Sequence, residues 1–356
     1  MKLLTRYLIK ELSVMSLYAL LALLALYSFF DIISEISDIG IGSYTSSTML
    51  QYIALQMPAH AYELMPLAVL IGGLLALSRL SSSSELTVIK SSGISTRKLI
   101  ATLLGFGLLF AVGTIVLGEW LAPASTRYAQ NMKTLAQNGT VSTGADGLWL
   151  REQHSFINIR EMLPDQSLRG ITAYRHNDDF KLAETWSAES ATQSADGTWQ
   201  LQNVQRSILQ ADKVAVSQQN SEIWQANFDR RLLDVLLVRP EQMSISSLTA
   251  YISHLENNKQ QTDSYRIAWW NKLMYPIATV VMALVALAFT PQSSRHTNMG
   301  LKLFGGICLG LAFHFAGRLF GFSGRLYGFP APLAAMLPTL IFALWAIVLI
   351  YRQEKR

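Results

Sequence analysis

SSSSELTVIKSSG, residues 81–93, is a polar stretch that separates two apolar runs at residues 49–80 and 99–117. The runs match or exceed the roughly 20 residues that a helix needs to cross a bilayer. Basic residues flank the stretch on both sides: Arg79, Lys90, Arg97 and Lys98. Because Lys and Arg accumulate in cytoplasmic loops, the stretch is predicted to be a cytoplasmic loop between two membrane spans.

The same stretch carries the signals of a short helix at about residues 83–92. Ser82 and Glu85 have the spacing of a capping box, and Gly93 can end the helix in a left-handed conformation. One face of this helix would carry Leu86, Ile89 and Lys90. Two interpretations stay open: a rigid contact for a cytoplasmic motor, or a turn between two spans in which Glu85 only caps.

Composition indicates membrane spans combined with a soluble domain. The chain has 356 residues, of which 51% are apolar and only 15% charged, and its mean hydropathy is +0.26. The net charge of +5 is spread over the ends of apolar runs, which is typical of membrane orientation and not of nucleic-acid binding. The single cysteine, Cys308, excludes an intramolecular disulfide.

The apolar runs predict six transmembrane helices, three on each side of one large domain. They cover residues 12–33, 49–80, 99–117, 267–289, 299–320 and 329–351. The basic N-terminus lacks the short apolar core and cleavage site of a signal peptide, so the first span is expected to be retained with its N-terminus inside. The predicted domains are therefore 1–120, 121–262 and 263–356, with the middle one outside the cytoplasm.

The middle domain reads as all-β. Short alternating segments such as 156–159, 170–174 and 198–202 are separated by turn signals, which favours a β-jellyroll or sandwich. Within 244–257, residues Ile245, Leu248, Ile252 and Leu255 recur at helical spacing. This last piece is predicted to be a helix that docks on the membrane domain.

No catalytic motif is apparent, so the chain is expected not to be an enzyme. There is no Walker-type loop, H-E-x-x-H, G-x-S-x-G or CxxC, and no cofactor or metal is predicted for this chain. His314 and Arg318 stand one turn apart on the fifth span, where a proton relay competes with simple packing and snorkelling, which the sequence favours. Whether His314 or Glu63 titrates in function stays open. A stripe on the same span, which would line an apolar cavity or pack against a neighbour, consists of Phe313, Gly317 and Phe320.

Cations at the outer ends of the spans run against the usual charge bias. Arg127 and Lys133 follow the third span, and Arg325 falls in the outer loop before the sixth. They would bind the phosphates of an anionic lipid. The competing interpretation is ordinary ion pairing with acids near the first span, namely Asp31, Glu35 or Asp38.

Several motifs together resemble the LptF/LptG permease family, with the LptG branch the nearer match. They are the segments 84–93 (SELTVIKSSG), 118–123 (GEWLAP), 148–149 (LW), 182–186 (LAETW), 244–248 (SISSL) and 325–330 (RLYGFP). The set extends over essentially the whole chain, and its members occur in the family's order.

The resemblance implies a permease subunit of an ABC-type exporter of lipopolysaccharide or lipo-oligosaccharide in the bacterial inner membrane. Its partners would be an LptF-like permease, an LptB-like ATPase dimer that binds ATP and Mg, an LptC-like membrane protein and an LptA-like periplasmic bridge. Glu85, Leu86, Ile89 and Lys90 would form the coupling helix toward the ATPase, and Lys133 would meet lipid phosphates. A second basic position of the family is Gln130 here, and acids occupy the outer end of the first span where the family can carry lysines.

Two other functions fit the missing ATPase motifs equally well. One is a mechanotransmitting ABC subunit that moves its outer domain without carrying a lipid. The other is a structural scaffold without an ATPase, in which replacing Glu85 would change only local stability.

Overall fold

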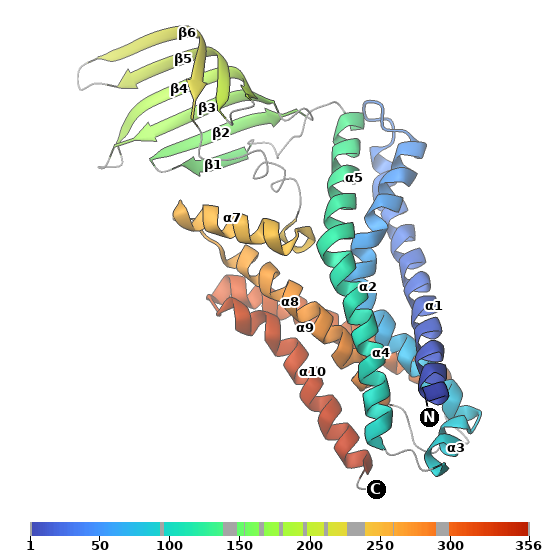
Figure 1. The fold of residues 1–356 in the computed structure, drawn as a ribbon. Helices are drawn as coiled ribbons and strands as arrows, with labels where there is room; N and C mark the ends of the chain where they lie inside the picture. The colour runs from blue at the N-terminus through green and yellow to red at the C-terminus, as the bar shows by residue number, and fades with distance from the viewer. Residues whose placement is uncertain are drawn as a thin grey trace.

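The structure is a computed structural model of the chain. It describes all residues except 1, 93–95, 138–147, 153, 164–166, 178–180, 195–197, 210–212, 226–238, 259, 290–298 and 355–356. Within the described part, a long helical domain carries an antiparallel sheet at one end, and the short helix α3 lies at the opposite end (Figure 1). Gly93, which was predicted to end the short helix, lies outside the described residues.

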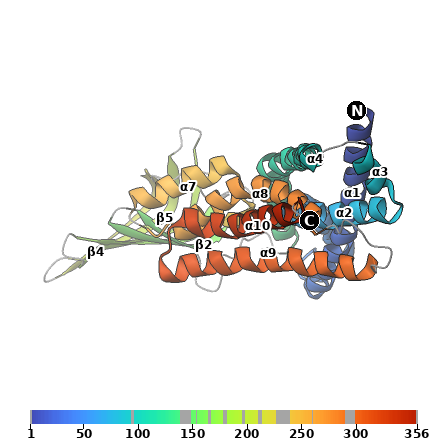
Figure 2. The same cartoon turned by 90° about the horizontal axis from the view of Figure 1, so that it is seen from below.

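Six helical stretches of the described chain are long and apolar enough to cross a membrane, which confirms the predicted helical membrane protein. The helices are α1 (Lys2–Glu35), α2 (Ser46–Ser82), α3 (Glu85–Ser91), α4 (Thr96–Val116), α5 (Ala122–Gln137), α7 (Ile245–Asn257), α8 (Asp263–Ala288), α9 (Met299–Tyr327) and α10 (Ala331–Glu354). Two 3-10 turns, η1 (Ile36–Asp38) and η3 (Pro240–Gln242), also belong to the described helical part. Seen from below, α8 and α10 lie between α4 on one side and α9 on the other (Figure 2).

The third span does not end where the sequence predicted. A π-helical turn, η2 (Leu117–Leu121), joins α4 to α5, and the helix continues to Gln137. The helix therefore continues for 16 residues beyond the predicted domain boundary at residue 121. α5 is polar overall, so it lacks the signal of a span, but it packs an apolar face against α2. Pro123 lacks the N–H of a regular helix, and the widened turn before it accommodates this loss.

The described residues between α5 and α7 form one six-stranded sheet, so the all-β prediction is confirmed. Its strands are β1 (Leu148–Glu152), β2 (Ser155–Met162), β3 (Leu168–His176), β4 (Leu182–Gln193), β5 (Trp199–Leu209) and β6 (Val214–Trp224). They pair in sequence order as an antiparallel meander, and no crossover of the jelly-roll kind occurs among these described strands. One face carries the buried apolar side chains, for example Ile157, which stands opposite Ala173 in the register.

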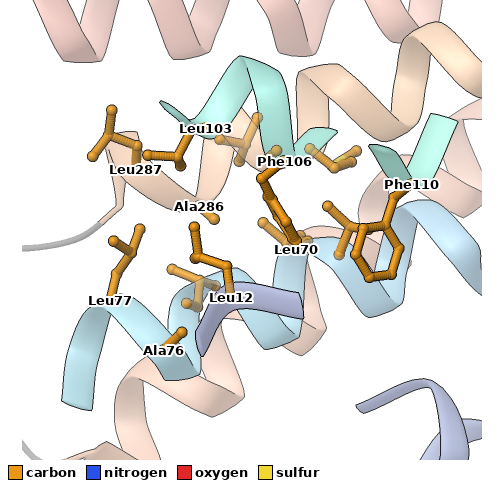
Figure 3. Close-up of a cluster of buried hydrophobic side chains, with 14 of the residues drawn as sticks. Leu12, Leu70, Ala76, Leu77, Leu103, Phe106, Phe110, Ala286 and Leu287 are labelled. Atoms are coloured by element: carbon orange, nitrogen blue, oxygen red, sulfur yellow. The ribbon is translucent and has the colours of Figure 1, made fainter. Parts of the chain in front are cut away.

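The membrane domain is organised around α2. In its most apolar window 78% of the residues are buried, against 22% for α1 and 11% for the fifth span in α9. α2 contributes Leu70 and Leu77 to a core that α1, α4 and α8 complete with Leu12, Phe106 and Ala286 (Figure 3). α1 and α9 therefore leave most of their apolar surface for lipid or for another protein.

The predicted docking helix is present as α7. Ser244 is its N-cap, and the Ser244 hydroxyl accepts a hydrogen bond from the Ser247 N–H at 3.2 Å. Leu248, Tyr251 and Leu255 are buried against Ala268 in the first turns of α8. The segment that leads back from the sheet is thus anchored to the membrane domain.

Candidate functional site

Helix α3, which the sequence predicts to be cytoplasmic, begins at Glu85, but the predicted capping box is wrong. Ser82 is the last residue of α2, and its hydroxyl donates to the Arg79 carbonyl at 2.9 Å. The chain then turns through Ser84, whose φ of +61° is left-handed. The Ser83 hydroxyl, in place of Ser82, hydrogen-bonds the Glu85 carboxylate at 3.0 Å. Because the serine run extends α2 first, α3 is only seven residues long.

Glu85 is held by the N-terminal helix. The Tyr7 hydroxyl donates a hydrogen bond of 2.9 Å to Glu85 Oε2. One turn further along α1, Glu11 accepts from Arg79 Nη1, also at 2.9 Å. The N-terminal end of α1 is therefore tied to both α2 and α3. Tyr7 was missed by sequence reasoning because it is 78 residues away from Glu85 in the chain.

The other coupling candidates divide between the two sides of α3. Leu86 and Ile89 are buried in the membrane-domain core, so they anchor the helix instead of presenting a surface. Val88 is 64% exposed and points away from that core. The side chain of Lys90 lies outside the described residues. A force applied to the exposed side of α3 would therefore reach the bundle through Leu86 and Ile89.

Lys133 lies at the centre of an ion-pair cluster at the C-terminal end of α1. Its Nζ is 2.7 Å from Glu35 Oε2 and 2.8 Å from Asp38 Oδ2. The same ammonium group lies 5.1 Å from the centre of the Tyr52 ring and 5.8 Å from that of Tyr44. The alternative of ordinary ion pairing is therefore realised with Glu35 and Asp38. A phosphate could bind Lys133 only in competition with two carboxylates.

The side chains around Lys133 form further hydrogen bonds with one another. The Tyr44 hydroxyl donates to Glu35 Oε2 at 3.0 Å, and burial together with this bond raises the pKa of Tyr44 well above its ordinary value. Gln130, at the family's second basic position, donates to the Tyr52 hydroxyl at 3.1 Å. Asp31, the third acid that the sequence offered to Lys133, instead pairs with His60, with Oδ2 2.8 Å from Nε2.

Neither arginine candidate belongs to the ion-pair cluster around Lys133. Arg127 is half-buried on α5, six residues before Lys133 and on another side of the helix. Arg325 belongs to the last turn of α9, so its prediction as a loop residue is wrong, and it is exposed. The sequence RLYG continues the helix by one turn until Gly328, which has a φ of +65°.

The predicted stripe on α9 is partly used for packing. The Phe313 ring packs edge-to-face against Phe342 of α10, with ring centres 5.3 Å apart. A Cβ placed on Gly317 would meet no atom within 4 Å, so this position is open. Phe320 is half-buried. An apolar cavity between this stripe and a partner stays a prediction. Among the described residues, no group of three His, Cys, Asp or Glu side chains could hold a metal ion.

We expect replacement of Lys133 by methionine to destabilise the protein, because it leaves two partly buried carboxylates without their cation. The free energy of unfolding should fall by about 1–3 kcal/mol. The double variant Lys133→Met/Glu35→Gln should recover part of this loss, as a double-mutant cycle of thermal unfolding in detergent would measure. Arg325→Met is the exposed control. Equal unfolding temperatures for wild type and Lys133→Met would contradict this account.

Comparisons with known proteins find similarity over nearly the whole chain. A family model described as "Lipopolysaccharide export system permease LptF/LptG" matches residues 6–352. The chain is 29% identical over 306 residues to the lipopolysaccharide export system permease protein LptG of Haemophilus influenzae, covering 85% of this chain and 86% of the relative. It is 28% identical over 318 residues to LptG of Escherichia coli K12, covering 88% of each chain.

Proposed function

We propose that this chain acts in lipopolysaccharide export, because it belongs to the LptF/LptG family of lipopolysaccharide export system permeases. It would be the LptG-type permease subunit, placed in the bacterial inner membrane with its sheet in the periplasm. The observation that carries this proposal is the extent of the match, because residues 6–352 reach from the first to the last of the six candidate spans and include the described sheet. The subunit would extract lipopolysaccharide or lipo-oligosaccharide and pass it toward the outer membrane.

The energy would come from an LptB-like ATPase dimer, which would bind ATP and Mg. This chain would offer it the exposed side of α3, including Glu85 and Val88. Support comes from the position of α3 at the end of the bundle away from the sheet, and from the burial of Leu86 and Ile89 in the core (Figure 1). The contact at Glu85 would therefore act on the whole bundle and not on a loose loop.

The lipid would enter between this chain and an LptF-like subunit, beside α1 and α9. These two helices have the least buried apolar windows among the six spans found in the described chain, which supports their place at an interface or gate. Phe313, Gly317 and Phe320 would face the acyl chains. The lipid phosphates would bind Arg127 and Arg325. They would also bind Lys133 once it has released its ion pairs with Glu35 and Asp38. The apolar face of the sheet would then receive the lipid and pass it to LptC-like and LptA-like partners.

A crosslinking experiment tests the transport role. A photoreactive amino acid is placed at Trp186, which packs against the apolar cluster of the sheet, or at Tyr174 as a control in the same sheet, outside that cluster. The complex with LptF-like, LptB-like and LptC-like partners is reconstituted in vesicles that contain lipopolysaccharide. We expect crosslinks to lipopolysaccharide at position 186 that require ATP, and few at position 174.

The same experiment separates the competing functions. ATP hydrolysis without ATP-dependent crosslinks at position 186 would favour a mechanotransmitting subunit that carries no lipid. Failure to bind any ATPase would favour a scaffold. Either result would overturn the proposed function.

A further inference from the structure

A buried lysine inside the membrane domain is not explained by the proposed transport path. Lys272 of α8 is only 6% exposed, and its Nζ donates a hydrogen bond to the Gly118 carbonyl of η2. The same Nζ lies 5.0 Å from the centre of the Tyr62 ring of α2. Because a buried cation costs several kcal/mol in a membrane, such a residue is a functional candidate when it joins separate elements. Here it joins α8 to η2 and α2.

The partner of Lys272 is a carbonyl of a π-helical turn. A π turn pairs residue i with i+5, so its carbonyl groups depart from regular α-helical bonding and one can accept from outside the helix. Tyr62 closes the other side of this turn, because a Cβ on Gly118 would lie 2.5 Å from the Tyr62 ring. Tyr62 in turn stacks on Tyr275 of α8, with ring centres 5.0 Å apart. The turn is thus packed against α2 and bonded to α8.

Glu119, the residue after Gly118 in this turn, contacts α7, the helix that follows the sheet in the chain. Both oxygens of the Glu119 carboxylate lie 3.0 Å from the backbone N–H of Ile245, the first residue of α7. A carboxylate at a helix N-terminus is favoured by hydrogen bonding and by the helix dipole. α7 follows the β domain in the chain and packs on α8 through Leu248 and Leu255. One turn therefore holds both α8 and α7.

We propose that Gly118, Glu119 and Lys272 form a joint that transmits movement of α4 to α7, the helix that follows the β domain in the chain. This inference rests on the proposed function, and it assigns Lys272 and Glu119 as positioning residues. The joint has two discrete arrangements: the Gly118 carbonyl bonds to Lys272 in the π turn, or it returns to regular helical bonding and releases Lys272. A change between them rotates α5 relative to α4, and Glu119 carries the movement to α7.

The test measures movement and transport separately. With Cys308 replaced by serine, spin labels are attached to exposed positions of α5 and α7 through Ala124→Cys and Ser253→Cys. In the wild-type complex we expect ATP to change the distance between the labels. Lys272→Met removes the donor but keeps a long apolar side chain, so it should abolish this change and reduce ATP-dependent crosslinking at position 186 by about tenfold. ATP hydrolysis should continue.

Two further variants keep the inference testable if Lys272→Met fails to assemble. Lys272→Arg retains a donor and should preserve more of the distance change than Lys272→Met. Glu119→Gln removes only the charge toward α7, and should reduce the change without touching the buried cation. Arg266→Met is the control for the contact between α8 and α7, because it removes the exposed ion pair of Arg266 with Glu256 of α7 and leaves Gly118, Glu119 and Lys272 unchanged.

The outcomes distinguish the joint from the proposed function. If the wild type shows no ATP-dependent crosslink, the transport role fails first. If the wild type transports lipid and Lys272→Met and Glu119→Gln keep the full distance change, the joint is only packing and the inference is wrong. If neither of those two variants assembles, the wild type decides the outcome: a label distance that stays unchanged on ATP addition overturns the inference.

Discussion

Glu85→Lys is expected to abolish co-purification of an LptB-like ATPase with this chain. The substitution reverses the charge at the beginning of α3 and removes the acceptor of the Tyr7 and Ser83 hydroxyl groups. Loss of a charge pair at an interface costs about 2 kcal/mol or more, which corresponds to at least about a thirtyfold weaker complex. The measurement is binding of the purified ATPase to the permease pair, together with lipid-stimulated ATP turnover.

Two variants separate the contact from the local hydrogen bonds. Tyr7→Phe removes the 2.9 Å bond to Glu85 but leaves its charge, so ATPase binding should stay close to that of the wild type. Glu85→Gln keeps the shape and one acceptor, and should bind at an intermediate level. If Glu85→Lys assembles and turns over ATP like the wild type, Glu85 serves only the local structure, and the contact lies elsewhere on the cytoplasmic side.

Gly72→Val is expected to cost most of the folded protein. A Cβ at Gly72 of α2 would lie 2.2 Å from the Ser16 Cα and 2.4 Å from the Ser16 nitrogen of α1. These are backbone atoms, so no side-chain rotation relieves the overlap and the two helices must separate. Overpacking of a well-packed contact costs about 1–3 kcal/mol and more where backbones collide. The yield of monodisperse protein and its unfolding temperature in detergent measure the effect.

The matched control is Gly113→Val in α4. A Cβ at Gly113 would meet no atom within 4 Å, so this variant carries the same intrinsic cost of valine in a helix without the clash. Similar losses for both variants would show that α1 and α2 do not depend on the close approach. α1 has few buried residues elsewhere along its apolar window, so this contact is decisive for its position.

Much of the architecture is readable from consecutive residues alone. The lengths of the apolar runs predicted six spans, and the alternating segments predicted the all-β domain, both confirmed by the structure. The helical spacing of residues 244–257 predicted α7 within one residue at its beginning. These features depend on hydrophobic length, periodicity and local capping, which are properties of neighbours in the chain.

The partners of the charged residues were decided only by the tertiary structure. Lys133 had three acids within reach by sequence, and the fold selected Glu35, 98 residues away, together with Asp38. Leu86 and Ile89 were placed on one face of α3 by periodicity, but periodicity does not say that this face is buried in the core. The π turn at Leu117–Leu121 allowed a polar segment to continue a membrane helix, and it gave Lys272 its acceptor. Such contacts depend on how separate helices approach one another, and local sequence signals carry no information on that approach.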